Sequence, residues 1–154
     1  LYGLETVSLR YFNVYGPKMD PASPYSAFIA IFAVGFLQGK PLTVHGDGTI
    51  ARDWTYIDNV IDANIRAATE PGAAGQVFNV ACSDSWELNR VIAELRRLIE
   101  VEGSITYGPP RPGDMPRSLA CIDKARELIG YEPQVDATEG LRLTVEWYKK
   151  QMAG

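Results

Sequence analysis

The sequence has 154 residues, a length that suits one domain and allows a sizeable hydrophobic core. Its 15 basic and 19 acidic side chains give a net charge of −4, which argues against a nucleic-acid-binding protein with a basic surface stripe. The longest apolar run, 27–37, is too short to span a bilayer, and no signal peptide is visible. We therefore predict a cytoplasmic protein, a single unit over 1–154, that binds neither nucleic acid nor membranes.

The sequence contains two cysteines, Cys82 and Cys121. Two are too few for a disulfide framework or a zinc site. Both lie in apolar runs typical of strands, so we predict buried free thiols in a reducing compartment.

The first half of the chain alternates between strand and helix patterns. Val7, Leu9 and Tyr11 alternate with polar residues, as in a strand, and the segment 25–38 is apolar on all sides, as in a buried helix. Asp58 stands where a helix N-cap is expected. These patterns predict, in order, a strand at 4–13, a loop at 18–24, a helix at 25–38, strands at 42–45 and 54–57, and a helix at 58–69.

The second half continues the alternation. The run 76–82 is almost wholly apolar, as in a strand covered on both faces, and 87–101 carries an apolar stripe opposite a charged side. Gly130 is placed as a helix stop, and Asp136 and Glu139 have the spacing of a capping box. We predict strands at 76–82, 104–107 and 119–122, and helices at 87–101, at 123–129 and from 136 onward.

The order of these elements predicts an α/β fold. Strands 6–13 and 76–82 are expected to be central and parallel, and the shorter strands to form a small accessory layer. The strand 6–13 begins almost at the first residue, and a strand with no earlier partner would leave its backbone groups unpaired.

The stretch 45–58 (His-Gly-Asp-Gly-Thr-Ile-Ala-Arg-Asp-Trp-Thr-Tyr-Ile-Asp) is the strongest candidate for a ligand site. Arg52 stands between a Gly-rich turn and an apolar strand, and a guanidinium matches phosphate oxygens with a planar fork of donors. An ordinary ion pair between Arg52 and a neighbouring carboxylate is the alternative. His45 is the only histidine in the sequence; we favour packing or stacking over a general base, because no acid or nucleophile partner is evident.

Two further segments carry chemistry. Asn13 falls just past the carboxyl end of a strand, where ligands of α/β sheets bind, and its amide can both donate and accept; a plain turn residue is the alternative. In 111–114 (Arg-Pro-Gly-Asp), the arginine suits a phosphate and the carboxylate a vicinal diol such as a ribose; the alternative is a proline-rich connector with a local ion pair. The sequence has no Gly-x-Gly-x-x-Gly, Walker loop, metal cluster or catalytic triad.

Several motifs, in this order, resemble a known family. They are 10–17 (Arg-Tyr-Phe-Asn-Val-Tyr-Gly-Pro), 46–48 followed by 52–58, 77–80 (Val-Phe-Asn-Val), 111–114 and 124–131 (Lys-Ala-Arg-Glu-Leu-Ile-Gly-Tyr). Over essentially its whole length the chain resembles the C-terminal part of an extended short-chain dehydrogenase/reductase, of the NAD-dependent nucleotide-sugar epimerase/dehydratase family, and most of all its UDP-hexose 4-epimerases. The resemblance implies the remainder of a Rossmann-type parallel sheet joined to a small α/β substrate-binding subdomain.

The resemblance also implies roles for the matching residues. The implied contacts to a UDP-sugar are Asn13, Ser26, Ala27, Thr43, His45, Arg52, Arg111 and Asp114, and the implied contact to NAD is Tyr11. In the family's pattern the two arginines and Asn13 hold the diphosphate, and Asp114 holds the ribose. Thr43 and His45 contact the uracil, and Tyr11 lies near the nicotinamide.

The chain departs from the family's pattern at its start. The family's glycine-rich NAD loop, catalytic Ser/Thr and Tyr-x-x-x-Lys pair are not in this sequence. The family oxidises the sugar at C4 with a tyrosine as base and NAD as hydride acceptor, rotates the 4-keto sugar and reduces its other face. We therefore expect a fragment that binds a UDP-sugar, lacks the NAD-binding N-terminal half and is inactive alone.

Two alternatives remain for the function. One is a non-catalytic binding or interaction module derived from this fold, and the other is the same portion of a nucleotide-sugar dehydratase or decarboxylase. In each case the strand 6–13 and nearby apolar faces would be uncovered without further chain beside them. We therefore predict self-association or a complementary N-terminal half as partner.

Overall fold

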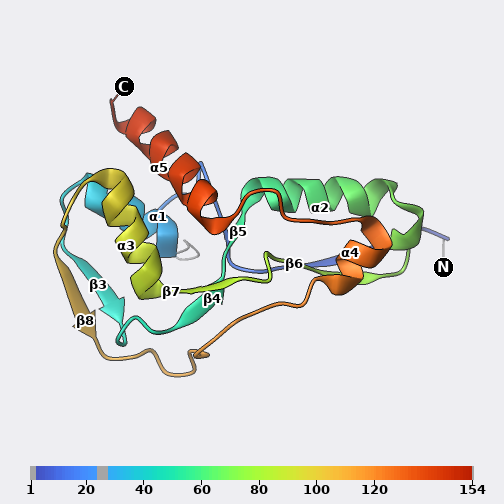
Figure 1. The fold of residues 1–154 in the computed structure, drawn as a ribbon, viewed down its shortest axis with the longest axis horizontal. Coiled ribbons are helices and arrows are strands. Elements are labelled where there is room, and N and C mark those ends of the chain that lie inside the picture. The colour runs from blue at the N-terminus through green and yellow to red at the C-terminus, as the bar shows by residue number, and fades with distance from the viewer. Residues whose placement is uncertain (1–2, 24–27, 154) are drawn as a thin grey trace.

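The computed structural model describes residues 3–23 and 28–153 as an elongated molecule with two lobes (Figure 1). Each lobe has its own cluster of buried apolar side chains. The described part of the chain begins at the tip of one lobe, and the C-terminal helix projects from the other (Figure 1). The fold is mixed α/β, as predicted.

The first lobe, called the sheet lobe, consists of a parallel strand pair and the helices that pack on it. Its elements are β1 (Ser8–Tyr11), β6 (Val77–Val80), α2 (Ile57–Thr69), the 3-10 turn η1 (Pro71–Ala73) and α4 (Asp123–Ile129). The parallel pairing of β1 with β6 confirms the prediction, but among the described residues each strand has one partner, so neither is central. Phe78 and Val80 are buried whereas Val77 is 37% exposed, so β6 is covered on one face and not on both as predicted.

The second lobe, called the cavity lobe, surrounds an apolar helix. Its elements are α1 (Phe28–Leu37), β3 (Leu42–His45), α3 (Leu88–Ile99), β8 (Ile105–Gly108) and α5 (Ala137–Ala153). The helix α1 is apolar on all sides, as predicted, and α3 and α5 pack against it. Phe32 and Phe36 meet edge to face in this core, with ring centroids 6.0 Å apart.

Short strands join the two lobes. β2 (Val14–Tyr15) pairs in parallel with β5 (Thr55–Tyr56), and β4 (Ala51–Asp53) pairs in antiparallel fashion with β7 (Ser85–Glu87). The strand predicted at 54–57 corresponds to the shorter β5, whereas β4, which ends just before Trp54, was not predicted. The indole of Trp54 donates to the carbonyl of Trp86, 3.3 Å away, and fixes the junction.

Helix α2 begins one residue earlier than predicted, at Ile57, with Tyr56 in the N-cap position. Asp58 lies in the first turn and does not cap the helix, so the predicted N-cap is wrong. A carboxylate in the first turn still interacts favourably with the helix dipole. The helix stop at Gly130 is confirmed, because Gly130 ends α4 in the left-handed conformation. Half of the predicted capping box forms: Asp136 Oδ1 accepts from the backbone N–H of Glu139 at 2.9 Å, while the Glu139 carboxylate binds Arg142.

The strand predicted at 119–122 does not form. The chain just before it makes one isolated bridge, between Arg117 and Ala51, and then continues as irregular structure. The prediction of two buried thiols is wrong for Cys121, which is exposed in this irregular segment. Cys82 is half-buried, and burial raises the pKa of its thiol to about 12.

Candidate functional site

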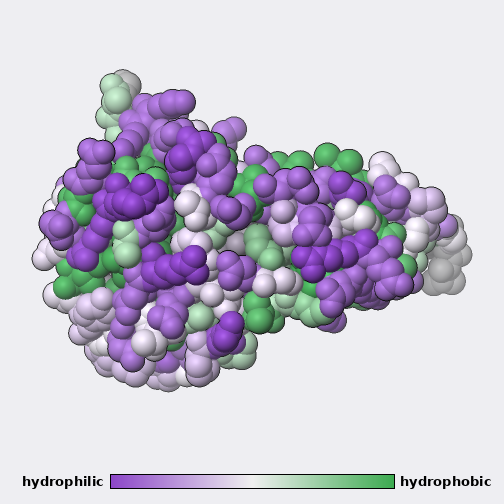
Figure 2. Space-filling view, viewed as in Figure 1, coloured by the Kyte–Doolittle hydropathy of each residue, from purple (hydrophilic) through white to green (hydrophobic). Residues whose placement is uncertain are grey.

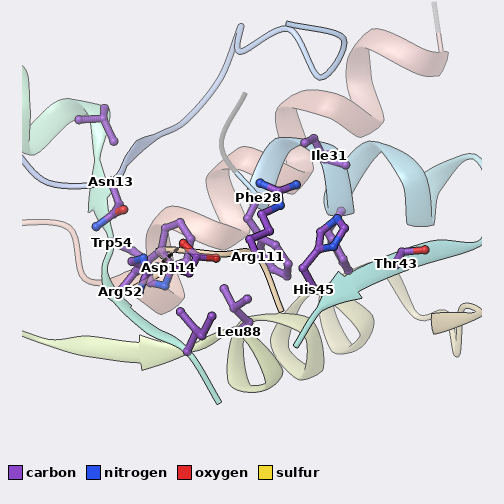
Figure 3. A pocket seen from close by; sticks show the side chains of 13 residues that line it. Asn13, Phe28, Ile31, Thr43, His45, Arg52, Trp54, Leu88, Arg111 and Asp114 are labelled. Carbon is purple, nitrogen blue, oxygen red and sulfur yellow. Dashed lines mark hydrogen bonds and ion pairs between the residues drawn. The ribbon is translucent and has the colours of Figure 1, made fainter. Parts of the chain in front are cut away.

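A cavity of about 600 Å³ opens in the cavity lobe beside β4 (Figure 3). Its walls come from segments far apart in the sequence and combine cationic, acidic, amide and imidazole groups with an apolar floor. The lining residues are Asn13, Val14, Phe28, Ile31, Phe32, Thr43, His45, Ile50, Arg52, Trp54, Leu88, Arg111 and Asp114. The volume, and a lining that combines apolar side chains with a few polar and charged groups, are typical of small-molecule sites.

The structure brings most of the predicted ligand contacts to this cavity. Those that line it are Asn13, Thr43, His45, Arg52, Arg111 and Asp114. Ser26 and Ala27 lie outside the described residues. Tyr11, predicted beside NAD, does not line the cavity, and its hydroxyl donates to Asn64 Oδ1 on α2 at 3.0 Å.

Arg52 is fixed in the cavity wall by three acceptors. Its Nη1 donates to the carbonyls of Ala51 (3.0 Å) and Met115 (2.7 Å), and its Nη2 donates to Asp114 Oδ1 (3.2 Å). The side chain of Arg52 is 17% exposed and that of Asp114 is 37% exposed. The ion pair considered as an alternative for Arg52 therefore exists, but it lies within the cavity lining, where both partners can also meet a ligand.

Arg111 and Asp114 are supplied by a proline-rich segment, residues 109–118, called the strap. The strap is exposed almost throughout. A turn brings the backbone N–H of Asp114 to the carbonyl of Arg111 (3.3 Å), with Gly113 at φ +83°, where a larger residue would be strained. The turn places both predicted contacts of this motif, Arg111 and Asp114, on the cavity.

Asn13 joins β1 to β2 with a backbone φ of +32°, in a region that asparagine tolerates better than most residues. Its Nδ2 donates to the carbonyl of Asp53 at 2.9 Å. This bond fixes the plane of the amide at the cavity wall. It leaves the second N–H and Oδ1 available, so Asn13 can still both donate and accept.

The opposite end of the cavity is formed by β3. In Figure 3, His45 and Thr43 lie at this end, away from Arg52 and Asp114. The hydroxyl of Thr43 lies 3.1 Å from that of Thr106 on β8. His45 is exposed and its imidazole has no hydrogen-bond partner within the described residues, so the ring can stack on a ligand.

The turn at 46–48 lies outside the cavity lining, although it is close in sequence to Arg52, the predicted phosphate contact. Asp47 Oδ1 accepts from both the N–H and the hydroxyl of Thr49, at 3.0 and 2.6 Å, and these bonds lower the pKa of Asp47. A Cβ at Gly48 would lie 2.0 Å from Asn89 Oδ1. The turn therefore shapes the backbone between β3 and β4.

Sequence patterns do not single out Asp53, which is fully buried. Its carboxylate accepts from the backbone N–H groups of Cys82 (2.9 Å) and Ala120 (3.2 Å). Burial raises the pKa of this carboxyl, and the backbone hydrogen bonds oppose the rise. The signal that could have found it is a charged residue inside a buried apolar-aromatic run, where an unsatisfied carboxylate would be costly.

Within residues 3–23 and 28–153, no group of three or more His, Cys, Asp or Glu side chains is arranged to hold a metal ion. None of the helices in this described part of the chain is long and apolar enough to cross a membrane.

Comparisons with known proteins agree on the family. The model of the NAD dependent epimerase/dehydratase family matches residues 1–81. The UDP-glucose 4-epimerase of Mycolicibacterium smegmatis is 34% identical over 151 residues, which cover 98% of this chain and 48% of that protein. The chain thus spans about half the length of the curated relatives it matches.

Solved structures extend this likeness to the fold. A crystal structure of UDP-glucose 4-epimerase with UDP-glucose from Thermotoga maritima matches with a TM-score of 0.92 at 37% identity, covering 98% of this chain and 48% of that one. UDP-glucuronic acid 4-epimerase from Bacillus cereus, in complex with UDP-glucuronic acid and NAD, matches with a TM-score of 0.85 at 31% identity, covering 94% and 45%. The predicted extended short-chain dehydrogenase/reductase fold is confirmed. Because the family model matches more than half of its residues, this chain belongs to the NAD dependent epimerase/dehydratase family.

Proposed function

We propose that the cavity binds a UDP-sugar and that this chain is the substrate-binding portion of an NAD-dependent 4-epimerase. The observation that carries the proposal is the meeting of Arg52 and Arg111, from distant segments, at one cavity of about 600 Å³. Two planar guanidinium forks suit the two phosphates of a nucleoside diphosphate. The similar structures that contain UDP-glucose or UDP-glucuronic acid support this choice of ligand.

The charged end of the cavity would hold the diphosphate and the ribose. Arg52 is already oriented by backbone carbonyls, so little side-chain entropy is lost when a phosphate binds to it. Asp114 uses Oδ1 for Arg52, and its Oδ2 remains for the ribose hydroxyls. Asn13 borders the same end, where its free N–H can reach a phosphate or sugar oxygen.

The apolar end would hold the uracil. Phe28 and Phe32 stack with ring centroids 3.9 Å apart and contribute aromatic rings to the lining. His45 and Thr43 face this end, and they offer a ring to stack on the base and a hydroxyl to hydrogen-bond its polar edge (Figure 3). The cavity therefore has one end that suits a base and another that suits the ribose and the diphosphate.

We infer that the described residues of this chain do not form a complete NAD site. The segment after β1 continues through Asn13, whose amide is bound to Asp53, into β2, with no glycine-rich turn leading to a helix N-terminus. Tyr11, the one implied NAD contact, is bound to Asn64. We propose that NAD and the hydride transfer belong to the family's N-terminal half, and that these 154 residues alone bind substrate without converting it.

The sheet lobe has a face that suits that complementary half. Among the described residues, β1 pairs with β6 on one side only. Ile61 and Ile65, one turn apart on α2, are 50% and 59% exposed, and Figure 2 shows hydrophobic atoms along the edge over α2. Open strand edges and apolar patches bind other chains. Because the relatives are about twice as long, we propose that an NAD-binding half covers this face, and that the chain self-associates through it when alone.

Calorimetric titration of the chain with UDP and with UDP-glucose tests the proposed function. We expect saturable binding of both, and a loss of about 10- to 100-fold in Arg111→Ala, because a hydrogen bond to a charged group contributes about 1.5–3 kcal/mol. The matched control is Arg126→Ala, which removes an exposed arginine on α4 that binds Glu132 and should leave the affinity unchanged. Absence of binding by the wild-type chain, both alone and mixed with the N-terminal half of a relative, would contradict the proposal.

A further inference from the structure

We propose that Asp53 is a positioning residue for the sugar-nucleotide cavity, one that holds Asn13 and the strap in place without touching the ligand. The inference rests on the proposed function of that cavity. Asp53 is fully buried and does not line the cavity, so its effect on binding must pass through the segments it holds.

The position of Asp53 follows from the alternation of side chains along β4. Successive side chains of a strand point to opposite sides. Arg52 faces the cavity, so Asp53 faces the interior between the two lobes, with Ser85 of β7 as its partner in the antiparallel pair. β4 thus supplies both a predicted ligand contact, Arg52, and the buried carboxylate of Asp53 on the opposite side of the strand.

The first tie runs from the backbone of Asp53 to Asn13. The Asp53 carbonyl accepts from Asn13 Nδ2 at 2.9 Å, and the Asn13 carbonyl accepts from the N–H of Thr55 at 3.3 Å. One bond holds the side chain of Asn13 and the other holds its backbone carbonyl. Together they stabilise a backbone φ of +32°, which is sparsely populated for residues other than glycine. The orientation of the Asn13 amide is therefore set by β4 and β5.

The second tie runs from the carboxylate to the end of the strap. Asp53 Oδ2 accepts from the N–H of Ala120, two residues past the strap, at 3.2 Å. Ala51 holds the strap itself, because its N–H donates to the carbonyl of Pro116 at 2.9 Å, and Arg52 holds it through Met115. Three successive residues of β4 thus anchor the segment that carries Arg111 and Asp114.

The third tie explains why a carboxylate is needed. Asp53 Oδ1 accepts from the N–H of Cys82, just after β6, at 2.9 Å. The two carboxylate oxygens therefore serve two backbone donors from different segments. An asparagine at this position has the same shape, but its NH₂ would face one of these N–H groups, so one tie would break.

A double-mutant cycle of Asp53→Asn with Arg111→Ala, measured as UDP affinity, tests the positioning role. We expect Asp53→Asn to weaken UDP binding by about tenfold in the wild-type background, since a broken buried hydrogen bond costs about 1–3 kcal/mol. In the Arg111→Ala background we expect a clearly smaller loss, because the main contact that Asp53 positions is already gone. Equal losses in both backgrounds, the signature of partial unfolding, would overturn the proposal, as would unchanged affinity of the single variant.

Two further measurements keep the test decisive. Asp58→Asn, which alters an exposed carboxylate on α2, is the matched control and should leave the UDP affinity unchanged.

If Asp53→Asn does not fold, amide hydrogen exchange of the wild-type chain replaces the affinity measurement. Saturation with UDP should slow exchange at Ala120 and Cys82 at least about fivefold, and unchanged rates would overturn the proposal. A wild-type chain that binds no UDP overturns the proposed function as well. If the wild-type chain binds UDP but the effects of Asp53→Asn and Arg111→Ala on affinity are additive, only the role of Asp53 is overturned.

Discussion

The two lobes differ in how completely their elements cover one another. In the cavity lobe, α1 is enclosed by α3 and α5, and Phe36 and Leu95 are buried between them. In the sheet lobe, β1 is largely exposed, β6 is covered on one face, and α2 presents isoleucines to solvent. The cavity lobe, whose core is closed, can therefore carry a preformed ligand cavity. The sheet lobe, which is open on one side, offers a surface for another chain. Because ligand binding and association are assigned to different lobes, mutations in one lobe should alter one property and leave the other unchanged.

The largest expected effect is on the stability of the closed lobe. Phe36→Ala should lower the free energy of unfolding by about 3–5 kcal/mol, because it leaves a cavity in the enclosed core. In the open lobe, Val77→Ala should cost less than about 1 kcal/mol, because Val77 is half-exposed. Urea denaturation followed by circular dichroism measures both, and similar losses at the two sites would remove the contrast between the lobes.

The next effect concerns association through the open lobe. Ile65→Lys should raise the dissociation constant of self-association at least about tenfold, because it replaces an apolar contact worth about 1.5–3 kcal/mol with a charge. Met152→Lys is the control, since Met152 is similarly exposed but lies on α5 in the cavity lobe. Sedimentation equilibrium measures both variants. A wild-type chain that stays monomeric at high concentration, or equal weakening by the two substitutions, would contradict the assignment of this face.

A smaller effect is expected within the cavity. Asp114→Asn should weaken UDP binding by about fivefold, roughly 1 kcal/mol, through the loss of a charged acceptor for the ribose. Its partly exposed ion pair with Arg52 contributes little by itself. The loss should disappear when 2′,3′-dideoxy-UDP is the ligand, because the hydroxyls are then absent. The same fivefold loss with the dideoxy nucleotide would show that Asp114 does not hold the ribose.

The smallest effect is a pH dependence at the junction of the lobes. Burial raises the pKa of Asp53 in the folded chain, so the folded state binds more protons than the unfolded state above the unfolded value of about 3.9. The stability that Asp53 contributes is thus present below about pH 4 and is lost as the pH rises through the folded pKa. Urea unfolding from pH 4 to 7 should show wild type losing stability relative to Asp53→Asn. A relative gain with rising pH would mean that the hydrogen bonds outweigh burial.

The parts of the fold and site that were predictable are those encoded by contiguous residues. Helices such as α3 carry a periodic apolar pattern. Arg52, Arg111 and Asp114 stand in short motifs whose residue types suggest ligand contacts without a structure. Asn13, which lines the cavity, was predicted as a ligand contact because ligands bind beyond the carboxyl ends of parallel strands. These predictions needed only local sequence and general rules of α/β folds.

The parts that were missed depend on contacts between distant segments. β2 and β7 are too short to show a periodic pattern, and their pairing partners decide that they are strands. The ion pair of Arg52 with Asp114 and the bond from Ala120 to Asp53 depend on how the segment 114–120 lies along β4. The bond from Cys82 to Asp53 depends on where the chain after β6 lies. The exposure of Cys121 and Val77 likewise depends on which neighbours cover them.

The most direct test of the central claim is a titration of the ¹⁵N-labelled chain with UDP, followed residue by residue by NMR. We expect saturable shifts at the amides of Thr43, Arg52 and Asp114, with the amides of β1 unchanged, because the ligand should bind at the cavity and leave the exposed edge of β1 as it is. Shifts concentrated in β1 and α2, or no saturable shifts at the cavity residues, would contradict the central claim.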